Sequence, residues 1–169
     1  MSGVVRLTGR IRVARPPAEA FGLFTPRGEQ DWVDGWQPHF PVPAPDDTEP
    51  GTVFETRAHG QPTIWLVTGR EPGRRICYAR VTPGNLAGTV TVTITPSGAH
   101  SDVEVTYELT ALTDTAVGSL RDFAAGYPGY LRSWQDAIRT GLPDPPGLPA
   151  RPACPACLDE WPIQLPIAR

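Results

Sequence analysis

Alternating apolar and polar positions mark strands along most of the chain. In residues 4–13, Val5, Leu7, Ile11 and Val13 alternate with arginine and threonine, which is the period of a strand with one buried and one solvated face. Segments rich in valine, threonine, isoleucine and aromatic residues then predict strands at 52–59, 63–68, 75–82, 88–95 and 102–111. Glycine and proline separate these segments, which favours hairpin connections and a largely antiparallel sheet.

Two short helical segments are expected after the first strand. Pro16 and Pro17 end that strand, and residues 18–25 predict a helix with apolar residues on one face. A second helical turn is expected at 31–35, and the proline-rich stretch that follows it predicts an irregular loop.

The segment 114–142 changes to helical period. Its apolar residues recur at spacings of four and three, which predicts one long amphipathic helix with a buried stripe of Leu120, Ala124, Tyr127, Leu131, Trp134 and Ile138. Pro128 and Gly129 predict a kink or a brief interruption. Gly141 is expected to cap the end of the helix.

The stretch IRVARPPAEAFGLFTPRGEQDWVDGWQPHF, residues 11–40, resembles the START-like helix-grip superfamily (SRPBCC), which includes polyketide cyclases and plant lipid-binding proteins. The resemblance implies an α+β fold: a curved antiparallel β-sheet wrapped around a long C-terminal α-helix, with two short helices after the first strand. It also implies a ligand cavity between sheet and helix. We therefore expect a ligand-binding domain at 1–142 and a separate proline-rich tail at 143–169.

The composition of the chain excludes several classes of binding partner and reaction mechanism. The net charge of -3 argues against nucleic acid as the main partner, because phosphate binding needs a basic patch, and the absence of lysine excludes a Schiff-base mechanism. No apolar run is long enough to span a membrane and no secretory signal is seen, so a cytoplasmic location is expected. Motifs for nucleotides, catalytic zinc and a serine nucleophile are missing, so no cofactor is expected.

Cys154 and Cys157 form a CxxC pair in the tail. A redox pair needs a helix start after a strand, and a zinc site needs two further ligands at suitable spacing. The proline-rich context offers neither, so we expect no metal. Trp161 and the apolar residues after it predict that the end of the tail docks on the domain.

Three side chains are candidates for chemistry. Glu29 precedes Trp32 at the expected cavity mouth, where it can act as a general acid or base or can have a purely structural role in the turn. Tyr78 and Arg80 share one face of their strand, and a buried arginine beside a tyrosine suits a carboxylate or enolate oxygen. The alternation leaves open whether Arg80, and likewise Arg57, faces the pocket or the solvent.

Three functions remain: binding of an apolar or aromatic small molecule such as a lipid or polyketide, a cyclase- or dehydratase-like enzyme, and a protein-interaction module of the chaperone-activator type. Enzymatic activity stays undecided at this level, and a homodimer is possible. Aromatic side chains suit flat apolar ligands. The residues expected to bind the ligand are Phe21, Phe24, Trp32, Trp65, Tyr78, Tyr107, Phe123 and Tyr127.

Overall fold

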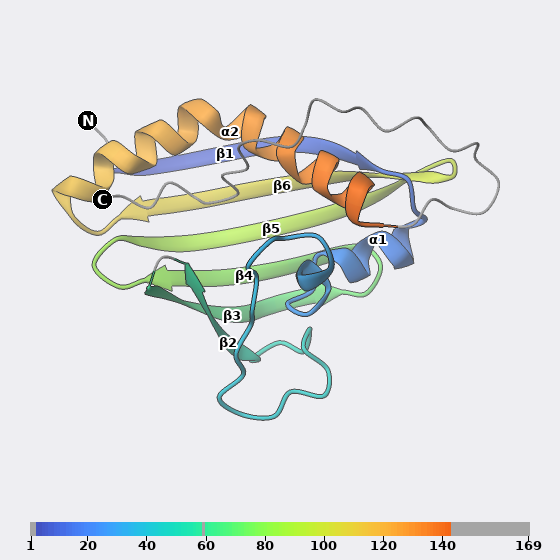
Figure 1. The fold of residues 1–169 in the computed structure, drawn as a ribbon, viewed down its shortest axis with the longest axis horizontal. Helices are drawn as coiled ribbons and strands as arrows, with labels where there is room; N and C mark the ends of the chain where they lie inside the picture. The colour runs from blue at the N-terminus through green and yellow to red at the C-terminus, as the bar shows by residue number, and fades with distance from the viewer. Residues whose placement is uncertain (1–2, 59, 143–169) are drawn as a thin grey trace.

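Six strands form one antiparallel sheet in the order β1-β6-β5-β4-β3-β2 in the computed structural model, which describes residues 3–58 and 60–142 (Figure 1). Short turns join consecutive strands from β2 to β6, while β1 pairs with the last strand. The strands are β1 (Val4–Val13), β2 (Val53–Ala58), β3 (Gln61–Glu71), β4 (Arg75–Thr82), β5 (Leu86–Ser97) and β6 (His100–Ala111). The helices are α1 (Pro17–Leu23), the 3-10 turn η1 (Gly28–Asp31) and α2 (Asp114–Gly141).

Side-chain alternation sets the register of β1 against β6. Apolar residues of both strands face the helix, and the opposite faces carry arginines on β1 and carboxylates on β6. Arg10 opposes Glu104 and Arg12 opposes Asp102, and each pair forms an ion pair of 2.9 Å. A slip by one residue would bury these charges, so the pattern specifies the pairing.

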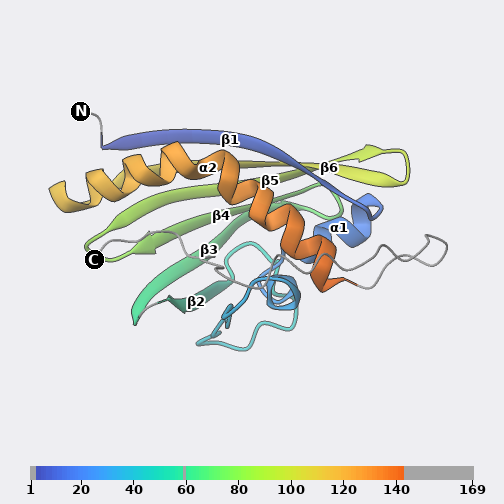
Figure 2. The same cartoon turned by 45° about the horizontal axis from the view of Figure 1, so that its top comes forward.

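The helix α2 lies across the concave face of the sheet, mainly over β1 (Figure 2). Its buried residues include Leu120, Leu131, Trp134 and Ile138, whereas Ala124 is half-buried. The part of the concave face over β3 to β5 is covered by α1, η1 and the loop that leads to β2 (Figure 1). This division of the sheet leaves room for a cavity beside the second half of α2.

The predicted fold class is confirmed, with differences at element boundaries. The second helical turn lies earlier than expected, at Gly28–Asp31, and the backbone N–H of Trp32 caps it by donating to the carbonyl of Glu29. The indole Nε1 of Trp32 donates to the carbonyl of Leu23 at 2.7 Å and so connects the turn to α1. The helix α2 runs without interruption through Pro128 and bends near its middle (Figures 1 and 2). Pro128 is exposed, so water can satisfy the carbonyl that lacks its helical donor.

Glycines allow close backbone packing at both ends of the candidate site. A Cβ at Gly28 would lie 1.7 Å from the carbonyl oxygen of Gly22, so only glycine lets η1 pack directly on α1. A Cβ at Gly141 would lie 3.0 Å from the carbonyl oxygen of Asp31. Gly141 is thus the last helical residue and a contact point with η1, rather than the predicted cap, which is Leu142.

Candidate functional site

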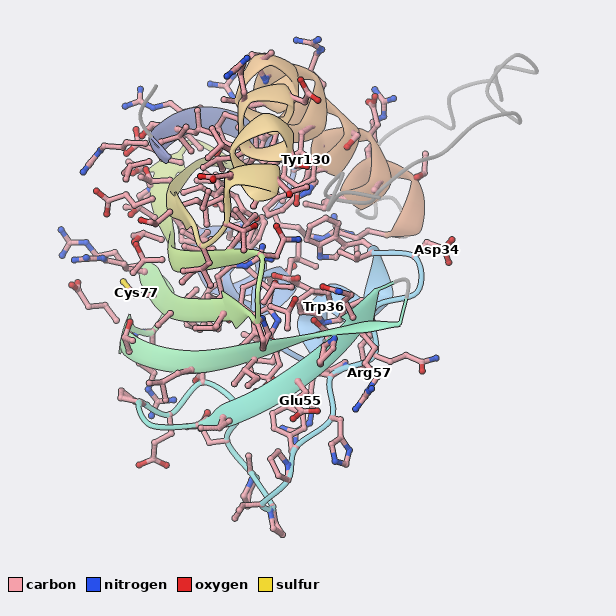
Figure 3. The ribbon with its side chains drawn as sticks, turned by 90° about the vertical axis from the view of Figure 1, so that its left-hand side faces the viewer. Asp34, Trp36, Glu55, Arg57, Cys77 and Tyr130 are labelled. Atoms are coloured by element: carbon pink, nitrogen blue, oxygen red, sulfur yellow. The ribbon has the colours of Figure 1, made fainter. Side chains whose placement is uncertain are left out.

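An internal cavity of about 70 Å³ lies between η1, the inner faces of β2 to β6 and the second half of α2. Its wall is largely aromatic, and the charged side chains on it are Glu29 and Arg80. The lining residues are Pro26, Glu29, Val33, Trp36, Phe54, Trp65, Tyr78, Arg80, Val90, Val92, Tyr107, Tyr130 and Trp134. Figure 3 shows Trp36 and Tyr130 between α2 and the sheet, while Cys77 points away from the interior.

Arg80 on β4 is the largest fully buried side chain of the core, with 1% of its surface exposed. Its Nη2 donates to the hydroxyl of Thr82 at 3.3 Å, and its Cζ lies 4.8 Å from the ring centre of Trp65. Among the described residues, Nε and Nη1 have no hydrogen-bond acceptor. Burial lowers the pKa of Arg80, but a guanidinium remains protonated at neutral pH. The cavity wall therefore contains a cation that is only partly compensated.

Two tyrosine hydroxyls face each other near Arg80. Tyr107 from β6 and Tyr130 from α2 lie 3.4 Å apart, oxygen to oxygen. Burial raises the pKa of both hydroxyls, while the charge of Arg80 acts in the opposite direction on each. Both tyrosines consequently stay neutral and can donate hydrogen bonds.

Glu29 extends from η1 toward the same cavity. The residue is half-buried, and the protein around its carboxyl desolvates the charged form, which raises its pKa well above 4.5. Negative charge on Glu29 also contributes to the raised pKa of Tyr78, after the larger effect of burial. A carboxylic acid with a raised pKa inside a cavity can give or take a proton near neutral pH.

Val33 and Trp36 separate the cavity from an open surface groove of about 520 Å³. The groove runs along residues 30–37 and is closed on its other side by the end of α2 at Ala137, Thr140 and Gly141. Trp36 is half-buried; its indole Nε1 donates to the carbonyl of Pro26 at 2.8 Å, and its ring meets that of Trp65 edge-on. One short segment thus forms the wall between the interior and the surface.

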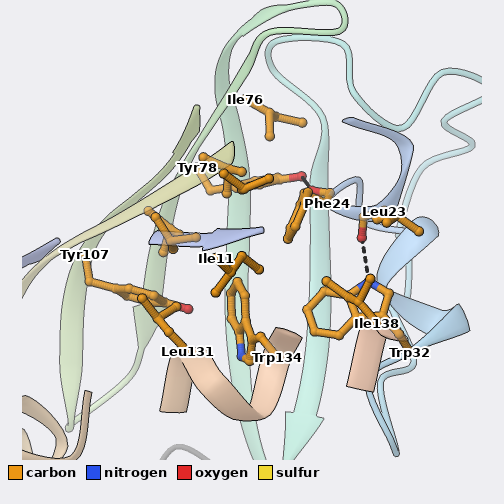
Figure 4. Close-up of a cluster of buried hydrophobic side chains, with 14 of the residues drawn as sticks. Ile11, Leu23, Phe24, Trp32, Ile76, Tyr78, Tyr107, Leu131, Trp134 and Ile138 are labelled. Carbon is orange, nitrogen blue, oxygen red and sulfur yellow. Dashed lines mark hydrogen bonds between the residues drawn. The ribbon is translucent and has the colours of Figure 1, made fainter. Parts of the chain in front are cut away.

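Of the aromatic residues that the sequence predicted as ligand contacts, the structure places only some on the cavity wall. Trp65, Tyr78 and Tyr107 line the cavity. The other five are buried but do not line it: Phe21, Phe24, Trp32, Phe123 and Tyr127. The ring of Phe24 packs on that of Trp32, and the ring of Phe123 packs on that of Tyr127. Figure 4 shows Phe24, Trp32 and Trp134 in one cluster, with the hydroxyl of Tyr78 bonded to the carbonyl of Phe24 at 2.8 Å.

The strand register decides which of the two arginines, Arg57 or Arg80, faces the cavity. Arg80 faces the cavity, whereas Arg57 is exposed and forms a 3.8 Å ion pair with Glu55. Sequence reasoning did not identify Phe54, Tyr130, Val90 or Val92 as cavity residues. An inward-facing strand position would have marked Phe54, whereas Tyr130 lies beside the main stripe of α2 and no local pattern distinguishes it.

Metal binding and membrane insertion were also considered from the sequence. Within residues 3–58 and 60–142, no group of three or more histidine, cysteine, aspartate or glutamate side chains is placed to hold a metal ion. Cys154 and Cys157 lie outside the described residues. None of the helices in the described ranges is long and apolar enough to cross a membrane.

Comparison with solved structures supports the same architecture. DynU16, a protein from the dynemicin biosynthetic locus, matches 83% of this chain at 18% identity and a TM-score of 0.58, and the match spans 49% of that protein. The protein MLL2253 from Mesorhizobium loti matches 80% of this chain and 98% of its own length at 17% identity and a TM-score of 0.60. The Aha1 dimer from Colwellia psychrerythraea matches 81% and 98% at 17% identity and a TM-score of 0.58.

At these identities the likeness shows the fold alone. The chain spans about half the length of DynU16. No curated protein matches it significantly in sequence. A family model described as "Polyketide cyclase / dehydrase and lipid transport" matches residues 4–132, which cover the sheet and most of α2. The chain belongs to this family of SRPBCC-type proteins.

Proposed function

We propose that the protein binds an apolar, aromatic small molecule in the cavity beneath α2. The observation that supports this most directly is an enclosed space walled by Phe54, Trp65, Tyr107 and Trp134, in a family whose members include lipid carriers and cyclases. Aromatic walls give a flat ligand a large contact area. Such a protein acts as a carrier or sensor of the ligand.

Access to this cavity requires the segment 33–36 to move. A volume of about 70 Å³ holds only a few water molecules, whereas pockets for drug-sized ligands measure roughly 300–1,000 Å³. The open groove on the other side of Val33 and Trp36 gives these side chains space to swing outward. In our proposal the ligand enters through the groove, displaces Trp36 and enlarges the cavity.

The test is a titration with the neutral fluorescent probe Nile red, together with native mass spectrometry of freshly purified protein for a co-purified ligand. Val90→Phe fills the cavity and should weaken probe binding at least tenfold. Val81→Phe places the same ring on the exposed face of β4 and should leave binding unchanged. Wild-type protein that shows no saturable binding would contradict the proposal and would favour a protein-interaction module.

One observation favours a second function, acid–base catalysis in the same cavity. Desolvation raises the pKa of the Glu29 carboxyl well above its ordinary value, and Glu29 lines the space that the ligand would occupy. Such a group catalyses enolisation or dehydration by proton transfer. If the protein is an enzyme, it should accelerate hydrogen–deuterium exchange at the methylene carbon of benzoylacetone in an NMR assay, and Glu29→Gln should abolish the acceleration. Bound benzoylacetone whose exchange is not accelerated would leave binding as the function.

A further inference from the structure

The guanidinium of Arg80 is buried without a counter-ion among the described residues. The ion pairs of this part of the chain connect other arginines to carboxylates and do not include Arg80. Its contacts are one hydroxyl, that of Thr82, and the face of Trp65. The Thr82 hydroxyl is also shared, because it lies 2.7 Å from that of Thr63.

Such an arrangement destabilises the folded protein. A buried charge normally has an opposite charge and a full set of hydrogen bonds, and its absence destabilises the folded state. A cation–π contact compensates only part of this cost. Packing alone does not explain Arg80, since an apolar side chain of similar volume would fill the same space without an unpaired charge.

The surroundings of Arg80 indicate what would complete the site. Arg80 lines the cavity together with Tyr107 and Tyr130, and its Nε and Nη1 have no hydrogen-bond partner among the described residues. Glu29 is the carboxyl on that wall, and it forms no ion pair with Arg80. Among the described residues, the site thus presents hydrogen-bond donors and positive charge but no anion paired with Arg80.

We infer that the cavity selects ligands that carry a delocalised oxyanion, a carboxylate or an enolate, which Arg80 binds through Nε and Nη1. Planar oxyanions match the planar guanidinium, and charge-assisted hydrogen bonds are about twice as strong as neutral ones. Tyr107 and Tyr130 share one hydrogen bond, so the hydroxyl whose proton is not used in it supplies one further donor for the ligand oxygen. This inference rests on the proposed ligand-binding function and specifies the chemical class of the ligand.

The experiment compares matched ligands by displacement of Nile red. For the carboxylate the pair is 2-naphthoate and its neutral isostere 2-naphthamide. For the enolate the pair is 4-nitro-1-naphthol, which is ionised at neutral pH, and its methyl ether. Wild-type protein should prefer the anion in at least one pair by about tenfold or more, because hydrogen bonds to charged groups contribute more than neutral ones. Whichever pair shows the preference identifies the oxyanion.

Arg80→Met supplies the second comparison. It should abolish the preference for the anion and raise the melting temperature by several degrees, since it removes an unpaired buried charge and keeps the volume. Arg57→Met, on the exposed edge strand, is the matched control and should change neither property. If R80M does not fold, Arg80→Gln removes the charge while keeping a side chain that can bond Thr82.

The two proposals fail in different ways. Wild-type protein that does not bind Nile red would contradict the ligand-binding function itself. Saturable Nile red binding with equal affinity for anion and neutral isostere in both pairs would overturn only the role of Arg80. A preference that persists in the charge-free variants would overturn it as well.

Discussion

Glu29 makes the stability of the folded protein depend on pH. Its carboxyl has a raised pKa in the folded state because burial disfavours the charged form. The unfolded chain releases this proton near pH 4.5, whereas the folded protein keeps it to higher pH. Above pH 4.5 the folded state therefore binds more protons than the unfolded state, and its stability must fall as pH rises until the carboxyl of the folded protein has ionised.

Glu29→Gln should remove this pH dependence. We expect the variant and the wild type to be similarly stable near pH 4, and the variant to become the more stable as pH increases. The difference should grow by at most about 1.4 kcal/mol per pH unit, the value for one proton. Denaturant unfolding between pH 4 and 8 measures it, with Glu49→Gln at an exposed position as the control. Parallel pH profiles for E29Q and wild type would show that Glu29 ionises normally in the folded protein.

At the level of single residues, the sequence identified the chemistry better than the location. Glu29, Tyr78 and Arg80 were selected as candidates for their functional groups, and all three line the cavity. Arg57 and Arg80 were indistinguishable, because each lies in an alternating strand whose inward face is set by pairing with distant strands. Only the assembled register places one inside and the other in solvent.

Among the elements, the second half of α2 contributes side chains both to the hydrophobic core and to the cavity wall. Trp134 contacts the rings of Trp32 and Tyr130, each at a centroid distance of 5.2 Å, and also lines the cavity. Trp134→Ala removes these contacts and leaves a void, so we expect a loss of about 3–5 kcal/mol in the free energy of unfolding. Chemical denaturation tests this, with Arg132→Ala on the exposed side of the same helix expected to have little effect. A loss below about 1 kcal/mol would mean that α2 is not anchored at Trp134.

The segment 33–36 is predicted to limit the rate at which a ligand enters the cavity. If Trp36 forms the barrier between groove and cavity, Trp36→Ala should speed association of Nile red by about tenfold or more, because less wall has to move before the probe enters. Stopped-flow fluorescence measures the rate, and Val42→Ala in the exposed part of the same loop is the control. An unchanged association rate in W36A would place the access route elsewhere.

Element types were predictable because their patterns are local. The alternation in β6 and the four-three stripe in α2 both appear as expected, since a strand or helix with one buried face must repeat its apolar positions. The 3-10 turn at Gly28–Asp31 was misplaced by about three residues. Its position depends on the contact of Gly28 with Gly22 and on the bond from Trp32 to Leu23, and neither contact has a periodic signature.

At the scale of the whole molecule, the architecture could be predicted, but the set of residues that lines the cavity could not. Antiparallel pairing and the position of the long helix follow from the order of elements and from the family resemblance, whereas the pairing of β1 with β6 comes from the structure. The cavity wall combines side chains from the loop region, five strands and α2, so its members are selected by three-dimensional packing. Phe24 and Trp65 are both buried aromatic residues, yet only Trp65 reaches the cavity.

The tail, residues 143–169, is predicted to hold no structural metal, and the test uses the full chain. A structural zinc site would contribute directly to folding stability, so its loss should lower the melting temperature. We expect Cys154→Ser combined with Cys157→Ser to leave the melting temperature and Nile red binding unchanged, with or without the chelator EDTA, because the proline-rich context lacks a second ligand pair. Cys77→Ser on the outer face of the sheet is the control for loss of a thiol. A drop of many degrees that occurs on adding EDTA to wild type, but not to the double variant, would instead assign the tail a metal-dependent role in stabilising the domain.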